Sequence, residues 1–128
     1  MRYLADTHTL VWYFTSDQRL GKIAYNRLEG SIEKGEILIP TIVLAELLYI
    51  SERGRIKLSF KDTLGKIEIN DNYEIVPLDI DVLMEADKIK PMLEMHDRLI
   101  VATAILYDAE IITKDRQIIE AGVIKTIW

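Results

Sequence analysis

The sequence predicts an α/β protein with a parallel sheet that is flanked by helices on both faces. Short apolar runs of strand length alternate along the chain with longer stretches that carry apolar residues at helical spacing. This strand–helix order favours right-handed crossovers, which make neighbouring strands parallel. With 128 residues, 49% of them hydrophobic, and no repeat or linker, residues 1–128 are expected to form a single domain.

The first part of the chain is expected to contain one strand and two helices. Residues 2–5 form a short apolar strand, and Thr9 is placed to cap a brief helix that ends at Phe14. Apolar residues at helical spacing predict a second helix over residues 17–34. Gly35 is its expected stop.

The next part is expected to contain a buried strand and two further helices. Residues 36–40 form the strand, which the proline at its end stops. Thr41 is expected to cap a helix that runs to about Glu52, before the Arg-Gly pair that marks its end. Residues 59–70 follow as another helix.

The remainder of the chain completes the alternation and brings the expected total to about five strands. Its predicted elements are a strand over 74–78, a helix from Asp81 to about Lys90 before Pro91, a helix from Asp97 to Leu106, a strand over 110–113, a helix over 115–121 and a strand over 123–127.

Composition limits the functions that the chain can have. The absence of cysteine excludes disulfides and thiolate metal sites and is compatible with a reducing cytosol. An acid as early as Asp6 and the lack of a long apolar run argue against a signal peptide and a membrane span, so a cytoplasmic protein is expected. The net charge of −5 argues against binding nucleic acid through a broadly basic surface, but it leaves a metal-mediated phosphate site open.

Three aspartates stand where parallel α/β folds place their chemistry. Asp6 and Asp115 follow the ends of predicted strands, and Asp97 opens a predicted helix. The carboxyl ends of parallel strands and the first turns of the following helices face one crevice. Each aspartate alone is more often a helix cap. As a set, they predict a shared site.

Glu46 is the fourth candidate acid, because it lies within an apolar stretch of a predicted helix. Its neighbours one turn away are Ile42, Val43, Tyr49 and Ile50. An ionised carboxylate in such surroundings needs a cation, a hydrogen-bond donor or a wet crevice. The alternative is a glutamate that reaches solvent past its apolar neighbours.

Clustered carboxylates repel each other unless a cation compensates their charge. A set of three or four carboxylates favours Mg²⁺ or Mn²⁺ over zinc. Such an ion can hold a phosphate oxygen and activate a water molecule, which is the chemistry of phosphodiester hydrolysis. The acids therefore predict a metal-dependent site for a phosphate ester.

Several other residues have a functional and a structural interpretation. Thr113 can hold a metal-bound water, orient a carboxylate or simply fill a strand position. Arg98 can bind a site acid or substrate phosphate, or form a structural ion pair. His8 and His96 flank two of the acids and either move protons or make surface hydrogen bonds.

A local excess of basic residues lies between positions 53 and 66 of this acidic chain. It contains Arg53, Arg55, Lys57, Lys61 and Lys66, opposed only by Asp62. The segment either guides an RNA backbone towards the crevice or is a solvated helix face. The aromatic residues Trp12, Tyr13, Phe14 and Tyr49 either stack on bases or pack in the core or in a protein interface.

Four segments, in the expected order, resemble the PIN-domain family and within it the VapC-type toxin ribonucleases. They are Leu-Ala-Asp-Thr-His at 4–8 followed by Val11-Trp12, Leu-Ala-Glu-Leu at 44–47, Asp-Arg-Leu-Ile-Val-Ala-Thr-Ala at 97–104, and Ile-Thr-Lys-Asp at 112–115. Many members carry Asp-Pro shortly before the Asp-Arg pair, where this chain has Glu94-Met95.

The resemblance implies a PIN-like three-layer α/β/α fold and an Mg²⁺- or Mn²⁺-dependent endoribonuclease. It implies that the metal is held by Asp6, Glu46, Asp97 and Asp115, with Thr113 assisting. It also implies a homodimer that is inhibited by a cognate antitoxin. A PIN nuclease with a role in RNA processing, outside any toxin pair, is the nearest alternative.

Three other classes are weighed against this interpretation. A phosphoacceptor receiver domain, with Asp79 as its acceptor, needs an acidic doublet after the first strand, and Asp6 stands between Ala5 and Thr7. A phosphatase with an aspartate nucleophile needs a second aspartate where His8 stands. A metal-free interaction module is not excluded by any residue.

Overall fold

A single five-stranded sheet organises the computed structural model, which describes residues 1–89 and 93–128. Its strands are β1 (Arg2–Ala5), β2 (Ile37–Pro40), β3 (Tyr73–Val76), β4 (Ala109–Ile112) and β5 (Thr126–Ile127). They lie in the order β3-β2-β1-β4-β5, and every pair is parallel. The predicted parallel α/β architecture is confirmed.

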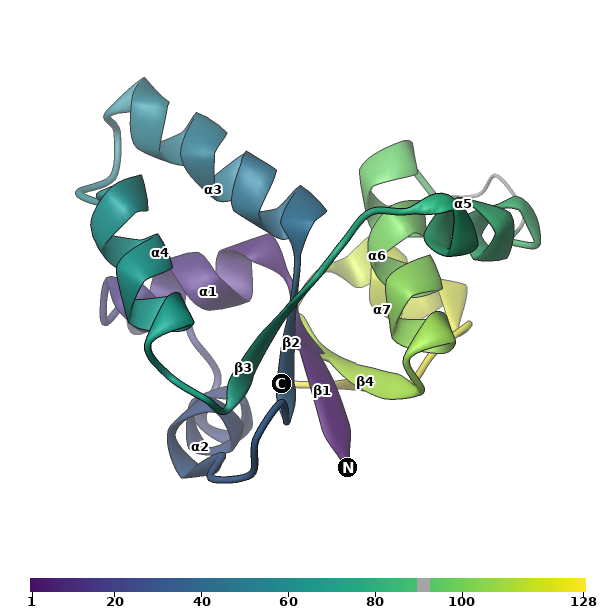
Figure 1. Ribbon diagram of the computed structural model, residues 1–128, viewed down its shortest axis with the longest axis horizontal. Helices are drawn as coiled ribbons and strands as arrows, with labels where there is room; N and C mark the ends of the chain where they lie inside the picture. The colour runs from purple at the N-terminus through teal and green to yellow at the C-terminus, as the bar shows by residue number, and fades with distance from the viewer. Residues whose placement is uncertain (90–92) are drawn as a thin grey trace.

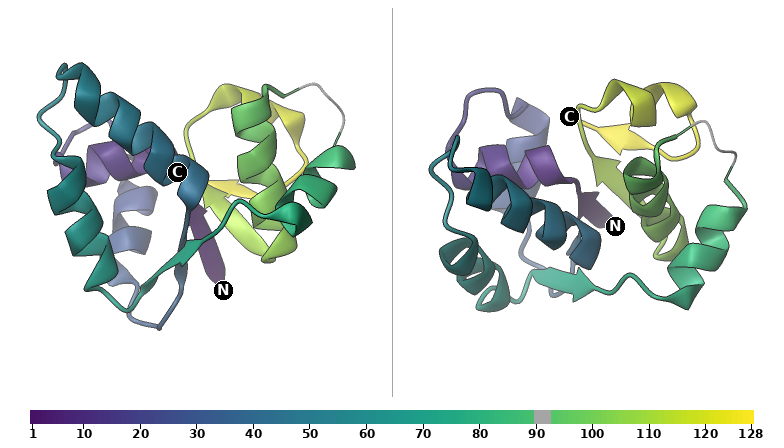
Figure 2. Two further views of the ribbon diagram at one scale, coloured as in Figure 1. Left: turned by 45° about the horizontal axis from the view of Figure 1, so that its top comes forward. Right: turned by 90° about the horizontal axis from the view of Figure 1, so that it is seen from above.

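Seven helices in the described residues cover this sheet. They are α1 (Thr7–Phe14), α2 (Lys22–Gly30), α3 (Thr41–Arg53), α4 (Phe60–Glu68), α5 (Ile80–Asp87), α6 (Met95–Leu106) and α7 (Arg116–Ala121). Figures 1 and 2 show α1–α4 grouped on one side of the strands and α5–α7 on the other. This is the expected three-layer arrangement. None of these helices is long and apolar enough to cross a membrane.

The core lies around the central strands, which are buried on both faces as parallel strands usually are. Leu4 of β1 pairs in register with Leu38 of β2 and with Ile111 of β4, and all three side chains are fully buried. From β1 the chain crosses to β2 on one side and later returns to β4 on the other. The carboxyl end of β1 is therefore a switch point, where such folds place their ligand sites.

The first helix begins earlier than predicted, and its cap is Asp6 rather than Thr9. The Asp6 carboxylate accepts a hydrogen bond from the Thr9 backbone N–H at 3.0 Å. The helix starts at Thr7 because Asp6 directly follows β1 and offers the carboxylate that a helix N-terminus needs. Thr9 lies inside the helix, where its hydroxyl is used to hold Asp6.

The predicted helix over 17–34 is wrong at both ends, since α2 covers only residues 22–30. Before it, Asp17 accepts hydrogen bonds from the backbone and side chain of Arg19 and forms a turn. Gly21, at the cap position, passes so close to Trp128 that an added Cβ would lie 2.7 Å from the indole. Gly35 does not stop this helix; with φ +69° it makes the turn that leads into β2.

Other element ends differ by smaller amounts. Thr41 is not a cap, because Pro40 occupies the cap position and the Thr41 hydroxyl accepts the Leu78 N–H at 3.0 Å. Helix α4 lies within the predicted 59–70, and β3 and β5 are shorter than expected. Asp79 caps α5, which ends at Asp87 and is therefore shorter than predicted; Lys90 and Pro91, where the end was expected, lie outside the described residues.

Candidate active site

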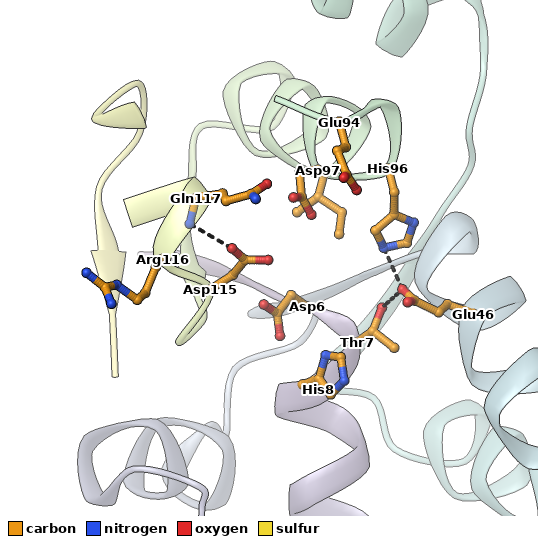
Figure 3. Close-up of a pocket in the computed structure, with 11 residues that line it drawn as sticks. Asp6, Thr7, His8, Glu46, Glu94, His96, Asp97, Asp115, Arg116 and Gln117 are labelled. Atoms are coloured by element: carbon orange, nitrogen blue, oxygen red, sulfur yellow. Dashed lines mark hydrogen bonds and ion pairs between the residues drawn. The ribbon is translucent and has the colours of Figure 1, made fainter. Parts of the chain in front are cut away.

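A pocket of about 340 Å³ opens at the carboxyl ends of β1 and β4. It is lined by Asp6, Thr7, His8, Glu46, Glu94, His96, Asp97, Ile100, Asp115, Arg116 and Gln117. The four predicted acids thus come from α3, α6 and the strand ends to one pocket. Figure 3 shows Asp6, Asp97 and Asp115 pointing towards a common space, while the Glu46 carboxylate, on the other side of the pocket, is directed to Thr7 and His96.

Asp6 is the most buried of these acids, with 6% of its surface exposed. One oxygen accepts hydrogen bonds from the backbone N–H of Thr9 and from its hydroxyl at 2.7 Å, and the other accepts one from the Thr113 hydroxyl. Burial raises the pKa of Asp6, and these hydrogen bonds oppose that rise. The carboxylate is held in one orientation at the floor of the pocket.

Thr113 links two of the acids, although its side chain is fully buried behind the pocket. Its hydroxyl donates to Asp6 and accepts the backbone N–H of Asp115 at 3.0 Å. Asp115 in turn caps α7 by accepting the Gln117 N–H at 2.8 Å. Asp6 and Asp115 are therefore helix caps and pocket acids at once.

Asp97 lies in the first turn of α6 and carries the clearest sign of crowded negative charge. Its pKa is raised to about 6, first by burial, then by the Asp115 carboxylate, with Glu94 and Asp6 adding to the rise. A nearby divalent cation would remove this repulsion. A cation bound in the pocket would therefore reduce the electrostatic repulsion among these carboxylates.

The Glu46 carboxylate is bound by side chains from two other helices at the wall of the pocket. Its Oε2 accepts the Thr7 hydroxyl at 2.7 Å and lies 2.6 Å from Nε2 of His96. The His96 contact lowers the pKa of Glu46 and, through the same contact, the pKa of His96 is raised. A glutamate in an apolar helix turn is thereby stabilised by donors from two other helices.

We predict that Asp97→Asn stabilises the metal-free protein near pH 7. A pKa raised above its value in the unfolded chain means that the folded state loses stability as the pH rises from about 4 to about 6. For a fully buried group, this pKa shift would change the unfolding free energy by about 3 kcal/mol. Because Asp97 is partly exposed, the expected gain in unfolding free energy is about 1 kcal/mol. Thermal unfolding in EDTA should show this gain at pH 7 and almost none at pH 4.

Asp81→Asn is the matched control for that measurement, since Asp81 also lies in the first turn of a helix but outside the pocket. It should give no comparable gain. A lower melting temperature for Asp97→Asn at pH 7 would instead identify Asp97 as a stabilising residue of the helix N-terminus.

The carboxylate oxygens of the pocket are suitable ligands for a hard divalent cation. In this structure, however, several of these carboxylates are bound by neighbouring side chains. Within residues 1–89 and 93–128, no group of three or more His, Cys, Asp or Glu side chains is arranged to hold a metal ion. Glu46 is engaged by His96 and Thr7, and Asp6 by Thr9 and Thr113. Binding an ion would require rotation of some of these carboxylates towards one another.

The predicted basic residues do not line this pocket. The Arg98 guanidinium donates to the Ala86 carbonyl at 2.7 Å, so it joins α6 to α5. Arg53, at the far end of α3, donates to the Tyr49 hydroxyl at 2.7 Å and covers its ring. Arg55 and Lys57 line a separate hollow beside α1.

Thr7 and Thr9 are the residues that the sequence analysis missed, and both hold acids in place. A local signal existed for Thr9, because the residue three positions after a capping aspartate donates its backbone N–H to the cap side chain, which brings Thr9 next to Asp6. No local signal existed for Thr7, whose partner is 39 residues away. Glu94, which the resemblance left outside the site, lies on the pocket wall together with Arg116 and Gln117.

The fold and the pocket define an α/β protein with an acid-lined pocket at the switch point of a parallel sheet. The sequence model of the PIN domain matches residues 3–124, and the chain belongs to this family. Ribonuclease VapC22 of Mycobacterium tuberculosis is 27% identical over 117 residues, which cover 90% of this chain and 88% of that protein. The resemblance noted in the sequence is thereby confirmed at the level of the family.

Solved structures share the fold across the whole chain. VapBC2 from Rickettsia felis bound to a DNA fragment from its promoter has a TM-score of 0.77 at 21% identity, covering 100% of this chain and 99% of that one. DNA-bound VapBC from Salmonella typhimurium has a TM-score of 0.70 at 18% identity, covering 99% and 97%. At this identity the likeness establishes the PIN-like fold.

Proposed function

We propose that this protein is a metal-dependent endoribonuclease that hydrolyses RNA phosphodiester bonds. The observation that carries the proposal is the convergence of Asp6, Glu46, Asp97 and Asp115 on one pocket of a PIN domain. The name of the relative from Mycobacterium tuberculosis, a ribonuclease, supports the choice of RNA as substrate.

Asp6, Glu46, Asp97 and Asp115 would hold Mg²⁺ or Mn²⁺. When bound, the ion supplies a Lewis acid for a phosphate oxygen and lowers the pKa of a water molecule. Asp6 is oriented for this by Thr9 and Thr113, and the Asp97 carboxylate, whose pKa is about 6, would be fully anionic beside a bound cation.

Two further residues at the pocket have roles in this proposal. His96 holds the Glu46 carboxylate at the wall of the pocket through its Nε2 contact. The exposed Arg116 side chain lies at the edge of the pocket, is paired with Glu120 at 3.2 Å and points away from the acids in Figure 3, so it would have to rotate to meet a phosphate of the substrate. Thr113 acts through Asp6 and Asp115 and is a positioning residue.

We further propose that the protein is the toxin of a toxin–antitoxin pair. Solved toxin–antitoxin complexes of the same fold support this proposal. It includes a cognate antitoxin as partner, a homodimer as the oligomeric state, one domain over residues 1–128 and a cytoplasmic location. A PIN nuclease of RNA processing is the second candidate, which the same acidic pocket would serve equally.

The proposal predicts cleavage of single-stranded RNA that requires added Mg²⁺ or Mn²⁺ and stops in excess EDTA. The measurement is gel analysis of a labelled oligonucleotide with purified protein, and Asp6→Asn purified in parallel controls for contaminating nucleases. Cleavage that persists equally in EDTA, or in Asp6→Asn, would contradict it. Growth arrest on expression, absent for Asp6→Asn, separates a toxin from a processing enzyme.

A further inference from the structure

A second hollow in the surface of the protein carries basic and aromatic groups in place of acids. It is a hollow of about 280 Å³ between α1, the turn that follows it and the segment between α3 and α4. We call it the basic hollow; its lining includes Trp12, Thr15, Asp17, Arg19, Arg55 and Lys57. Residues of α1 and of the segment that joins α3 to α4 line it together.

The charges of the basic hollow suit a phosphate backbone. Arg55 and Lys57 are exposed, and so is the Arg19 side chain, at 61%. The one carboxylate, Asp17, is already bound by the Arg19 guanidinium, with contacts of 2.8 and 3.0 Å. Two cations therefore remain in excess, which is the local reverse of the chain's net charge of −5.

The aromatic side of the basic hollow suits a nucleobase. The Arg19 guanidinium lies over the Trp12 ring, with its carbon 4.9 Å from the ring centroid. The indole and the guanidinium are both planar groups on which an unpaired base can stack. An acidic peptide would use the cations but would gain little from this stacking surface.

The basic hollow is connected to the acidic pocket along one side of α1. His8 lines the acidic pocket, and Trp12, one helical turn later, lines the basic hollow. Their rings are in contact, with centroids 5.7 Å apart. A single strand can therefore lie on the His8–Trp12 edge and reach both sites.

We propose that the basic hollow is a second RNA-binding site, which holds a nucleotide outside the acidic pocket through Trp12, Arg19, Arg55 and Lys57. This proposal rests on the proposed function for the identity of the ligand. It extends the expectation for Arg55 and Lys57, while Arg53, engaged with Tyr49, lies outside the site. Because the basic hollow would hold part of the RNA chain, oligonucleotides long enough to span both sites would bind more tightly than shorter ones.

Binding of a fluorescein-labelled octauridylate, measured by anisotropy, tests this proposal. Asp6→Asn serves as the background so that the RNA stays intact. In that background, Arg55→Glu and Lys57→Glu are each expected to weaken binding at least about fivefold, and neutralising either cation to lower the salt dependence by about 0.7 in log–log slope. Lys34→Glu is the matched control, since Lys34 is also exposed but precedes the amino end of β2 and does not line the basic hollow.

A second measurement reports on Trp12 itself. The chain has two tryptophans, so Trp128→Phe leaves Trp12 as the single emitter. Its fluorescence should be quenched by the octauridylate, and Lys57→Glu should shift that quenching to higher RNA concentration.

Unchanged binding in both charge-reversal variants, with melting temperatures like that of the parent, would overturn the proposal. The proposal would also be overturned if the charge-reversal variants bound poly-glutamate more weakly but bound RNA as before. That result would identify a site for an acidic peptide. Binding is measured in an inactive background, so its outcome does not depend on cleavage. A wild-type protein that fails to cut RNA would contradict the proposed function, and the binding measurement would still test the basic hollow.

Discussion

Replacing Asp6 by asparagine is expected to reduce RNA cleavage at least about 10³-fold, equivalent to roughly 4 kcal/mol of transition-state stabilisation. The substitution keeps the shape of the side chain but removes the charge that a divalent cation requires. Asp6 is the acid for which this loss should be largest, because it is buried at the floor of the pocket and three hydrogen bonds fix its orientation. Single-turnover cleavage at saturating Mn²⁺ measures the effect.

The other acids extend this test to the whole site. Glu46→Gln, Asp97→Asn and Asp115→Asn should also abolish metal-dependent cleavage, whereas Asp81→Asn, outside the pocket, should leave it intact. Retained cleavage in any two of the four pocket variants at saturating Mn²⁺ would discard the assignment of these residues. Melting temperatures at or above the parent's would show that the losses are chemical rather than structural.

The sheet could be predicted from the sequence because its central strands are buried on both faces. Residues 2–5, 36–40 and 110–113 are short runs rich in apolar residues, and burial on two faces leaves little room for any other pattern. The positions of Asp6 and Asp115 follow directly from this, since each comes just after such a run. The fold class and the location of the pocket could therefore be predicted from the sequence.

The partners of the acids were not accessible, because they depend on contacts between distant segments. Glu46 meets Thr7 and His96, which lie 39 residues before it and 50 residues after it. Arg98 was expected near phosphate or a site acid, yet it binds a carbonyl of α5. Its position in the first turn of α6 does not determine which way its long side chain points.

The errors at helix ends have a common local cause. Asp6 and Thr9 both have side chains that cap helices, and the sequence alone does not decide between two such residues three positions apart. The helix predicted over 17–34 was too long because its apolar spacing continues through turns that are closed by Asp17 and by Gly35. Periodicity detects the helix, whereas its ends are decided by tertiary contacts such as that of Gly21 with Trp128.

Thr113→Val is expected to lower cleavage about 10- to 100-fold although Thr113 touches neither solvent nor the pocket space. Valine has nearly the same shape, but it removes the hydroxyl that donates to Asp6 and accepts the Asp115 N–H, so both acids lose the group that fixes their relative positions. The unfolding free energy should also fall by about 1–2 kcal/mol, because a buried acceptor and a donor lose their partner.

Thr113→Ser separates positioning from stability in this experiment. Serine keeps the hydroxyl and loses a buried methyl group, so it should destabilise the fold by roughly 1 kcal/mol yet retain most of the cleavage. The two variants are compared by single-turnover rate, by Mn²⁺ titration followed calorimetrically, and by thermal unfolding. If valine and serine lose activity equally, in proportion to their loss of stability, Thr113 acts only as a core residue. If only valine requires more Mn²⁺, the hydroxyl holds Asp6 and Asp115 together for the cation.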